Sequence, residues 1–283
     1  YTSYWDRLGS AVEIRSYLLA RFWRIAPLYY TATVISILVF GTEDLAWSKV
    51  FFNVTFLMGF ANPGGTSMVV GGWSIGIEMV FYALFPVLVP VCAGKLLRLG
   101  LLTGTLLVGQ IIFANHVLGG TALINAWVAY TQPIAFAGYF AGGCLLAECY
   151  RRQADWKGSW VAWLTAIVSL LAFAAAPADS ETILTGIVGA GLTLAALAFV
   201  CGVAFMHEPR GVFRDFAEWI GRLSYPVYLL HPIVYHFVAK FPLAEVHILG
   251  TLFATLALSD VVNRVVERPA IRYARQLRGE APT

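Results

Sequence analysis

Eight apolar stretches, each about as long as a membrane-crossing helix, follow one another along the 283-residue chain. A helix needs about 20 predominantly apolar residues to cross the hydrocarbon core of a bilayer. The sequence therefore predicts an all-α polytopic membrane protein, a bundle of about eight transmembrane helices forming one membrane-embedded domain over residues 1–283. The expected spans are residues 25–42, 73–92, 99–115, 121–147, 160–177, 182–206, 223–239 and 247–263.

Composition and charge narrow the possible partners. Hydrophobic residues make up 59% of the chain and charged residues 12%, whereas a soluble globular chain carries about 25% charged residues. Membrane lipids are therefore the expected surroundings. The net charge of +3 is too small, and the basic residues are too scattered, to indicate a nucleic-acid partner. Cysteines and histidines show no metal-ligand spacing, so no metal site is expected.

One shorter apolar stretch, residues 50–60, cannot cross a bilayer and runs into Asn62-Pro63-Gly64-Gly65. These residue types favour turns and interrupt helices. Irregular backbone at membrane depth is tolerated only where protein or a water-filled cavity satisfies its polar groups. We therefore expect one broken or re-entrant segment here, with a pocket wall around residues 61–75.

The basic residues predict an orientation. When successive connections are assigned to alternate sides, seventeen of the nineteen lysines and arginines fall on one side, and the other side holds only Lys49 and Lys240. Cytoplasmic loops carry an excess of lysine and arginine. The distribution thus predicts a multi-pass protein with both ends of this chain in the cytoplasm.

Arg21 and Arg24 lie three residues apart at the expected cytoplasmic mouth of the first span. On a helix this spacing turns both guanidinium groups to one side. Two planar forks on one face can hold a phosphorylated ligand better than two lysines. Residue types alone favour the alternative, in which both arginines are interfacial anchors that reach toward lipid phosphates.

Ser74, Glu78 and Tyr82 recur every four residues in the second expected span, directly after Trp73, and form one polar stripe on a helix. A carboxyl group inside a span is costly unless it is paired, which makes Glu78 a candidate functional residue. Such a group is suited to proton transfer or to hydrogen bonding with a hydroxyl. The alternative is a structural carboxyl group tied to an arginine or to a helix N-terminus.

His231 lies near the middle of the seventh expected span, where Pro226 and Pro232 interrupt the helix. It could move a proton or bind a ligand, although a single histidine on an apolar helix is more often a packing residue. In the last span, Asp260 and Arg264 are four residues apart and predict a structural ion pair.

Four motifs follow one another in a set order. They are Arg-Phe-Trp-Arg-Ile-Ala-Pro-Leu-Tyr-Tyr from Arg21, Trp-Ser-Ile-Gly-Ile-Glu-Met-Val-Phe-Tyr from Trp73, Leu-Ser-Tyr-Pro-Val-Tyr-Leu-Leu-His-Pro from Leu223, and Glu-Arg-Pro from Glu267. With this order over residues 16–273, the chain resembles the membrane-bound acyltransferase-3 family. Its members O-acylate bacterial surface polysaccharides, lipid-linked sugars and small extracellular molecules. The form Gly-Gly-Trp-Ser-Ile-Gly-Ile-Glu is similar to that of members associated with exopolysaccharide production.

The resemblance implies an O-acyltransferase of the bacterial inner membrane. It would move an acyl group, usually acetyl, from cytoplasmic acyl-coenzyme A, a co-substrate and not a bound cofactor, to a hydroxyl of a cell-surface, exopolysaccharide or lipid-linked sugar. By the same resemblance Arg21 and Arg24 would engage the donor. Glu78 is the first catalytic candidate and His231 the second. The acceptor pocket would involve Trp73, Ser74 and Tyr82.

Members of the family normally have two further spans before the arginine pair, and the first of these carries the histidine thought to be the catalytic base. The printed chain contains neither span. The resemblance therefore predicts an N-terminally truncated chain that lacks the main catalytic histidine, and the chain's own histidines are not expected to replace it.

A transporter or flippase of a lipid-linked sugar or small solute is the alternative function. It would use the broken segment as its binding site. Transporters often carry broken helices at corresponding positions of two repeated halves. The sequence shows one clearly broken segment and no repeat, so acyl transfer is the favoured prediction.

Overall fold

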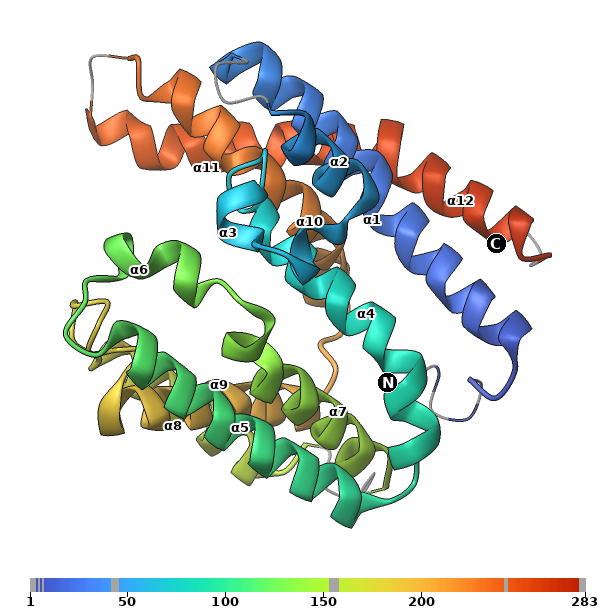
Figure 1. Ribbon diagram of the computed structural model, residues 1–283, viewed down its shortest axis with the longest axis vertical. Helices are drawn as coiled ribbons and strands as arrows, with labels where there is room; N and C mark the ends of the chain where they lie inside the picture. The colour runs from blue at the N-terminus through green and yellow to red at the C-terminus, as the bar shows by residue number, and fades with distance from the viewer. Residues whose placement is uncertain are drawn as a thin grey trace. The chain divides into compact units, whose positions relative to one another are not determined.

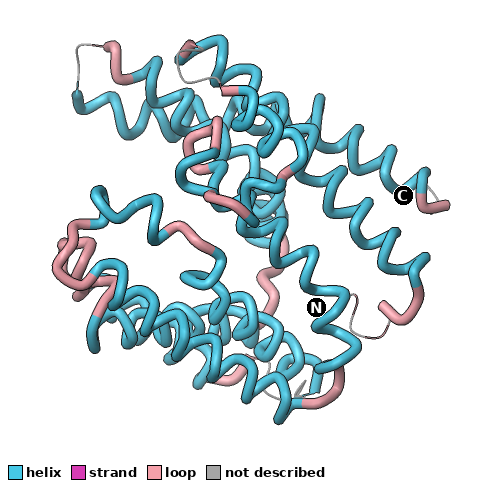
Figure 2. Tube along the Cα trace, viewed as in Figure 1, coloured by secondary structure: helices cyan, strands magenta, loops and turns pink. Residues whose placement is uncertain are grey.

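The computed structural model describes residues 4, 6, 8–41, 46–152, 158–241 and 244–279. These residues form helices and connecting loops, with no strand among them (Figure 2). The predicted all-α class is confirmed. Contacts divide the chain into two compact units: unit 1 comprises residues 1–10 and 83–208, and unit 2 comprises residues 11–82 and 209–283.

Among the described residues, five helices are long and apolar enough to cross a membrane. The polytopic membrane class is thereby confirmed, whereas the count of about eight crossings stays a prediction. The five are α1 (Ala11–Phe40), α4 (Gly72–Cys92), α5 (Leu96–Leu118), α9 (Gly186–Phe205) and the helix His247–Leu277.

Unit 1 contains the end of α4, then α5, α6 (Leu123–Tyr130), the short 3-10 helix η2 (Pro133–Phe136), α7 (Ala137–Arg152), α8 (Trp160–Ala174) and α9. Helices α8 and α9 lie side by side, and α5 packs along α7 (Figure 1).

The expected single span at residues 121–147 is wrong, because the chain is interrupted between α6 and α7. Pro133 explains the interruption. Proline has no N–H to donate within a helix and moves the residue before it out of helical geometry. Accordingly, Gln132 is extended, with φ −110° and ψ 153°.

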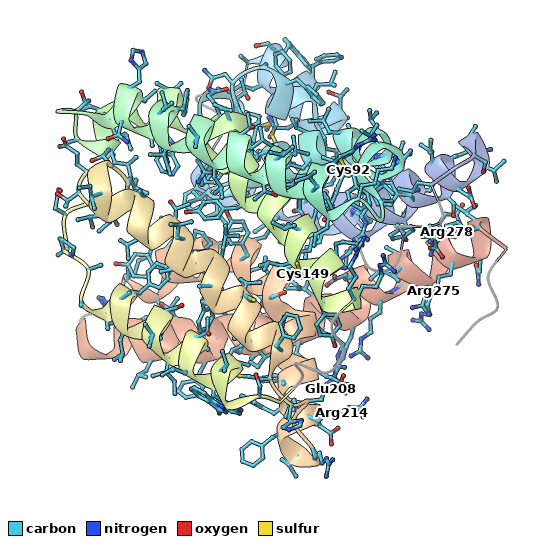
Figure 3. The ribbon with its side chains drawn as sticks, turned by 90° about the horizontal axis from the view of Figure 1, so that it is seen from below. Cys92, Cys149, Glu208, Arg214, Arg275 and Arg278 are labelled. Atoms are coloured by element: carbon cyan, nitrogen blue, oxygen red, sulfur yellow. The ribbon has the colours of Figure 1, made fainter. Side chains whose placement is uncertain are left out.

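Unit 2 contains α1, α2 (Trp47–Thr55), the 3-10 helix η1 (Leu57–Phe60), α3 (Pro63–Thr66), α4 as far as Tyr82, and the C-terminal helices. The predicted broken segment is confirmed, since residues 47–71 form three short helices and turns before α4 begins. The C-terminal helices are α10 (Val212–Val238), α11 (Ala244–Val262), the π-helical turn η4 (Asn263–Glu267) and α12 (Arg268–Leu277). Figure 3 labels Arg275 and Arg278 at the basic end of α12.

The side-chain amide of Asn53 holds the broken segment together. This side chain is buried, and its Nδ2 donates to the backbone oxygens of Lys49 and Thr66, both at 2.7 Å. Its Oδ1 accepts from the backbone N–H of Met68 at 3.1 Å and from the Tyr29 hydroxyl at 2.5 Å. An amide has two N–H donors and an oxygen with two lone pairs. All four capacities are used, so one residue joins α2, α3, the turn after α3 and α1.

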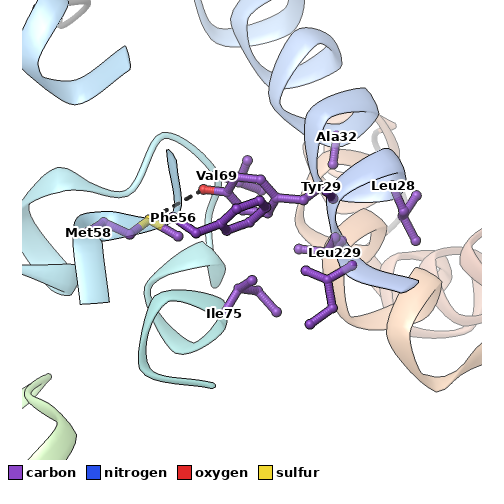
Figure 4. Close-up of a cluster of buried hydrophobic side chains, with 10 residues drawn as sticks. Leu28, Tyr29, Ala32, Phe56, Met58, Val69, Ile75 and Leu229 are labelled. Carbon is purple, nitrogen blue, oxygen red and sulfur yellow. Dashed lines mark hydrogen bonds between the residues drawn. The ribbon is translucent and has the colours of Figure 1, made fainter. Parts of the chain in front are cut away.

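An apolar core surrounds this amide. Tyr29 of α1 points into the broken segment beside Phe56 and Met58, and its hydroxyl lies 3.6 Å from the Met58 sulfur (Figure 4). Ile75 from the first turn of α4 and Leu229 from α10 belong to the same cluster. The broken segment is therefore packed between the helices of unit 2, which satisfies the requirement that irregular backbone in a membrane be covered.

Two glycines allow η1 to touch α4. A Cβ built on Gly59 would lie 1.9 Å from the backbone oxygen of Gly76, and one built on Gly76 would lie 2.8 Å from Cγ of Met58. No side chain fits between two backbones at this distance. The pair sets the position of the α4 N-terminus against the broken segment.

Gly59→Ala is expected to lower the free energy of unfolding by about 3 kcal/mol, the upper part of the usual range for overpacking, because the backbone of α4 must move. Thermal unfolding of the protein in lipid nanodiscs measures this. Gly104→Ala in α5 is the matched control, since a Cβ there meets nothing within 4 Å and alanine favours the helix. Equal melting temperatures for the two variants would contradict the close contact.

Candidate functional site

The polar stripe of α4 lines a cavity in unit 2. Ser74, Glu78 and Tyr82 all face this cavity, which has a volume of about 360 Å³. One further lining residue, Ile75, belongs to α4 itself. The others come from two other helices: Arg24 and Ile25 from α1, and Ser224, Tyr225 and Tyr228 from α10. The stripe that the four-residue spacing predicts is thus turned toward α1 and α10, and the cavity is made within one unit.

Glu78 and Tyr82 are joined to each other, and the Tyr82 ring lies against Arg21. The Tyr82 hydroxyl donates a hydrogen bond to Oε1 of Glu78. The guanidinium carbon of Arg21 lies 5.3 Å from the centre of the Tyr82 ring and 5.5 Å from that of Tyr17. These distances allow cation–π attraction. The two rings hold Arg21 in place, so this arginine acts on the cavity through Tyr82.

Helix α1 begins well before the arginine pair. The sequence predicts a first span that begins at residue 25, with the pair at its mouth. Helix α1 begins at Ala11 and continues past both arginines, because charged residues lower the hydropathy of a segment without ending its helix. Arg24 shares a cavity with Glu78, so donor-binding and catalytic candidates meet alongside the first half of α4. The place of the pair at the cytoplasmic mouth of the span stays a prediction.

Tyrosines of α10 form the third wall of the cavity. The Tyr228 hydroxyl donates to the backbone oxygen of Gly71 at 2.8 Å and lies 2.8 Å from Oγ of Ser74. The Tyr225 hydroxyl donates to the backbone oxygen of Ile25 at 2.8 Å. Gly71 has φ +84°, and a Cβ there would lie 3.0 Å from the Tyr228 hydroxyl. Glycine is therefore needed where α10 meets the turn before α4.

Sequence reasoning missed Ser224, Tyr225 and Tyr228. Their signal was present in Leu-Ser-Tyr-Pro-Val-Tyr, because Ser224 and Tyr228 are four residues apart and share a helix face. The prediction for this motif rested on His231 and its two prolines instead.

His231 does not line this cavity. Its ring is exposed, and Nδ1 lies 2.8 Å from the backbone oxygen of Tyr228 and 3.1 Å from that of Val227. Pro232 cannot supply the N–H that the Tyr228 carbonyl would receive in a regular helix. The histidine ring takes that role, which supports the structural alternative, and a catalytic role for His231 stays a prediction.

Trp73 is half-buried at the first turn of α4 and does not line the cavity, which begins one residue later at Ser74. Its assignment to the acceptor pocket stays a prediction. At the C-terminal end of α11, the predicted ion pair is confirmed, since Arg264 Nη2 lies 2.6 Å from Oδ2 of Asp260.

The cavity combines groups that suit a polar, partly anionic ligand. Arg24 supplies a positive charge, Glu78 a carboxyl group, and Ser74 and Tyr228 hydroxyls that can donate or accept. Arg24 is exposed whereas Ile25 and Ile75 are buried, so the cavity opens at the arginine and is closed by apolar residues. Such a site can hold an anionic group at its entrance and move a proton to or from a hydroxyl near Glu78.

Comparison with known proteins agrees with these features. The sequence model of a family described as an acyltransferase domain matches residues 8–264. The chain is also similar to the exopolysaccharide production protein ExoZ of Rhizobium meliloti (strain 1021), at 26% identity over 281 residues, which covers 90% of this chain and 80% of that protein. No solved structure matches the chain. With its family match extending over all but the ends, this multi-pass membrane protein belongs to the acyltransferase family.

Proposed function

We propose that the protein is an O-acyltransferase of the bacterial inner membrane. It transfers an acyl group, acetyl in the first instance, from cytoplasmic acyl-coenzyme A to a hydroxyl of a cell-surface or exopolysaccharide sugar. The observation that carries the proposal is the cavity in unit 2. It brings Arg24 together with Glu78 inside the region that matches the family.

The reaction assigns a task to each group around this cavity. The acceptor oxygen forms an ester bond with the acyl carbon, the thioester C–S bond breaks, and the hydroxyl proton ends on the coenzyme A sulfur. Arg24 at the open side suits an anionic phosphate of the donor, and Arg21 positions Tyr82. Glu78 and Tyr82 form a hydrogen-bonded pair that can orient the hydroxyl and take part in moving its proton.

The choice of a sugar acceptor is supported by the relative. ExoZ is named for exopolysaccharide production, and a polysaccharide offers many hydroxyl acceptors. The motif Gly-Gly-Trp-Ser-Ile-Gly-Ile-Glu lies at the N-terminal end of α4 and leads directly into the cavity wall.

The interruption between α6 and α7 is a second broken segment. The argument that a single broken segment disfavours a transporter therefore no longer holds. Family membership now gives the stronger argument, since the match to acyltransferases covers most of the chain. No described contact specifically favours transport.

Arg24→Ala is expected to raise the acyl-coenzyme A concentration needed for half-maximal rate about tenfold or more, the effect of losing one charge-assisted hydrogen bond. Arg21→Ala is expected to raise it as well, because Tyr82 then loses the cation that positions it beside the cavity. Lysine at either position should restore donor use only partly, because a point charge replaces a planar fork. Initial rates at varied donor concentration measure this. Arg214→Ala, on the exposed start of α10, is the control. Unchanged donor dependence in both alanine variants would support simple anchoring.

Glu78→Gln is expected to reduce acyl transfer by roughly 10²-fold, the usual scale for a general acid or base. Glutamine can still accept from Tyr82, so the melting temperature should change little. The assay follows label from radioactive acetyl-coenzyme A onto a polysaccharide acceptor in membranes that contain the protein. Glu218→Gln, an exposed carboxylate on α10, is the matched control. Absence of label with the unaltered protein would contradict the proposed function, and full activity in Glu78→Gln would remove Glu78 from the site.

The proposed orientation places residue 179 outside and residue 210 in the cytoplasm. Both side chains are exposed. We replace Cys92, Cys144, Cys149 and Cys201, then introduce Asp179→Cys or Arg210→Cys singly. A membrane-impermeant maleimide should label the first variant in intact spheroplasts and the second only after permeabilisation. The reverse pattern would overturn the orientation.

A further inference from the structure

Unit 1 contains a second cavity, with a volume of about 310 Å³, and it shares no lining residue with the cavity in unit 2. This volume lies in the range of small-molecule sites. Four helices supply its polar side chains: Gln110 from α5, Tyr130 from α6, Tyr139 from α7 and Thr193 from α9. Phe173 of α8 and residues of the connection between α8 and α9 also line it. None of these residues has a role in the proposed reaction.

Gln110 gives this cavity hydrogen-bond donors that the protein does not use. The residue is 4% exposed, in the middle of α5, and its Oε1 accepts from the backbone N–H of Gly138 at 3.0 Å. Because that N–H requires an acceptor, the oxygen end of the amide is fixed and the nitrogen end follows. Within the described ranges, Nε2 makes no hydrogen bond. Its two N–H groups are left for whatever occupies the cavity.

Two hydroxyl groups add to this set. The Tyr139 hydroxyl donates to Oγ1 of Thr193 at 3.2 Å, which leaves the hydrogen of Thr193 itself to donate elsewhere. Neither that hydrogen nor the Tyr130 hydroxyl has a hydrogen-bond partner in the described part of the chain. These groups face the cavity. The lining therefore offers several hydrogen-bond donors, which suit an occupant rich in oxygen acceptors.

The interruption between α6 and α7 positions the lining residues Tyr130 and Gln110. Pro133 ends the helical path just after Tyr130, so the tyrosine sits at the end of α6 beside the cavity. At the other side of the break, a Cβ on Gly138 would lie 2.8 Å from Oε1 of Gln110. Glycine thus lets α7 approach α5 closely enough for the amide to be held. Irregular backbone at membrane depth is expected where it lines a cavity.

The connection between α8 and α9, which lines the cavity, is held by hydrogen bonds at the C-terminal end of α5. Asn115 Oδ1 accepts from the backbone N–H of Gly186 at 2.8 Å, and Glu181 Oε1 accepts from that of Gly120 at 2.7 Å. The connection between α8 and α9 is therefore tied to α5 on both sides. This gives the cavity a preformed shape, which lowers the ordering cost of binding.

The chemistry of the lining selects the occupant. No lining residue carries a charge, so a phosphorylated donor or an anionic headgroup finds no counter-ion there. A lipid acyl chain offers no acceptors to Gln110 or Thr193. A pyranose ring has hydroxyl and ether oxygens at its edge and C–H groups on its faces. The C–H groups can pack against the aromatic rings of Tyr130, Tyr139 and Phe173.

We propose that this cavity is a carbohydrate subsite for an uncharged sugar residue, separate from the cavity that contains Glu78. That the sugar belongs to the acceptor polysaccharide rests on the proposed function, whereas the binding itself does not.

The test measures sugar binding to the whole chain in nanodiscs of phosphatidylethanolamine and phosphatidylglycerol, prepared without glycoside detergents because these would compete. The probes are cellotetraose, maltotetraose and a β-linked galactotetraose, with a tetramer of galacturonic acid as the charged comparison. Saturation-transfer NMR titrations give the dissociation constants. The test variant combines Tyr130→Phe with Thr193→Val, which removes two hydroxyls and retains the side-chain shapes. Thr165→Val is the matched control, because its exposed hydroxyl bonds only to the Val161 oxygen of its own helix.

At least one neutral tetrasaccharide should bind saturably and more tightly than the charged one. The double variant should weaken this binding about tenfold or more, the combined effect of two hydrogen bonds, while Thr165→Val should not. Two results would overturn the subsite: no saturable binding of any neutral probe, or equal binding by the double variant. Binding that depends on Tyr130 and Thr193 in a protein without acyl transfer would leave the subsite in place and remove the proposed function.

Discussion

The amide of Asn53 is the contact on which the unit 2 cavity depends. Its four hydrogen bonds fix the short helices of the broken segment, and the Gly59 and Gly76 backbones then fix where α4 begins. The start of α4 sets the direction of its polar stripe. A buried amide with all its capacities used is hard to replace, because any smaller or apolar side chain leaves several backbone groups without partners.

The stripe of Ser74, Glu78 and Tyr82 could be predicted because it depends only on the helical period and on the cost of a carboxyl group in a span. Its surroundings could not be predicted in the same way. Which residues of α1 and α10 face the stripe depends on how the helices are rotated and shifted against one another. A single sequence does not contain that register. Tyr228 and the place of Arg24 in the cavity were missed for this reason.

Hydropathy also concealed the second interruption. Residues 121–147 are predominantly apolar and contain no charged residue, so their average hydropathy indicates one span, although Pro133 marks the break locally. The two cavities described above both lie next to such interruptions. The physical reason is common to both, since a helix that stops within the membrane must direct its unpaired groups toward protein, water or ligand. A short interruption of a helix therefore indicates the position of a polar cavity better than the apolar segments around it do.

His231 and Pro232 form one structural unit. The imidazole replaces the N–H that proline lacks at the Tyr228 carbonyl. In a relative with another residue at 232, the backbone would supply its own N–H and the histidine would be free to vary. In a relative with the same proline, a side-chain donor at 231 would remain useful even where no chemistry occurs. A histidine at this position therefore has a structural reason in the adjacent proline, and its presence does not by itself identify a catalytic base.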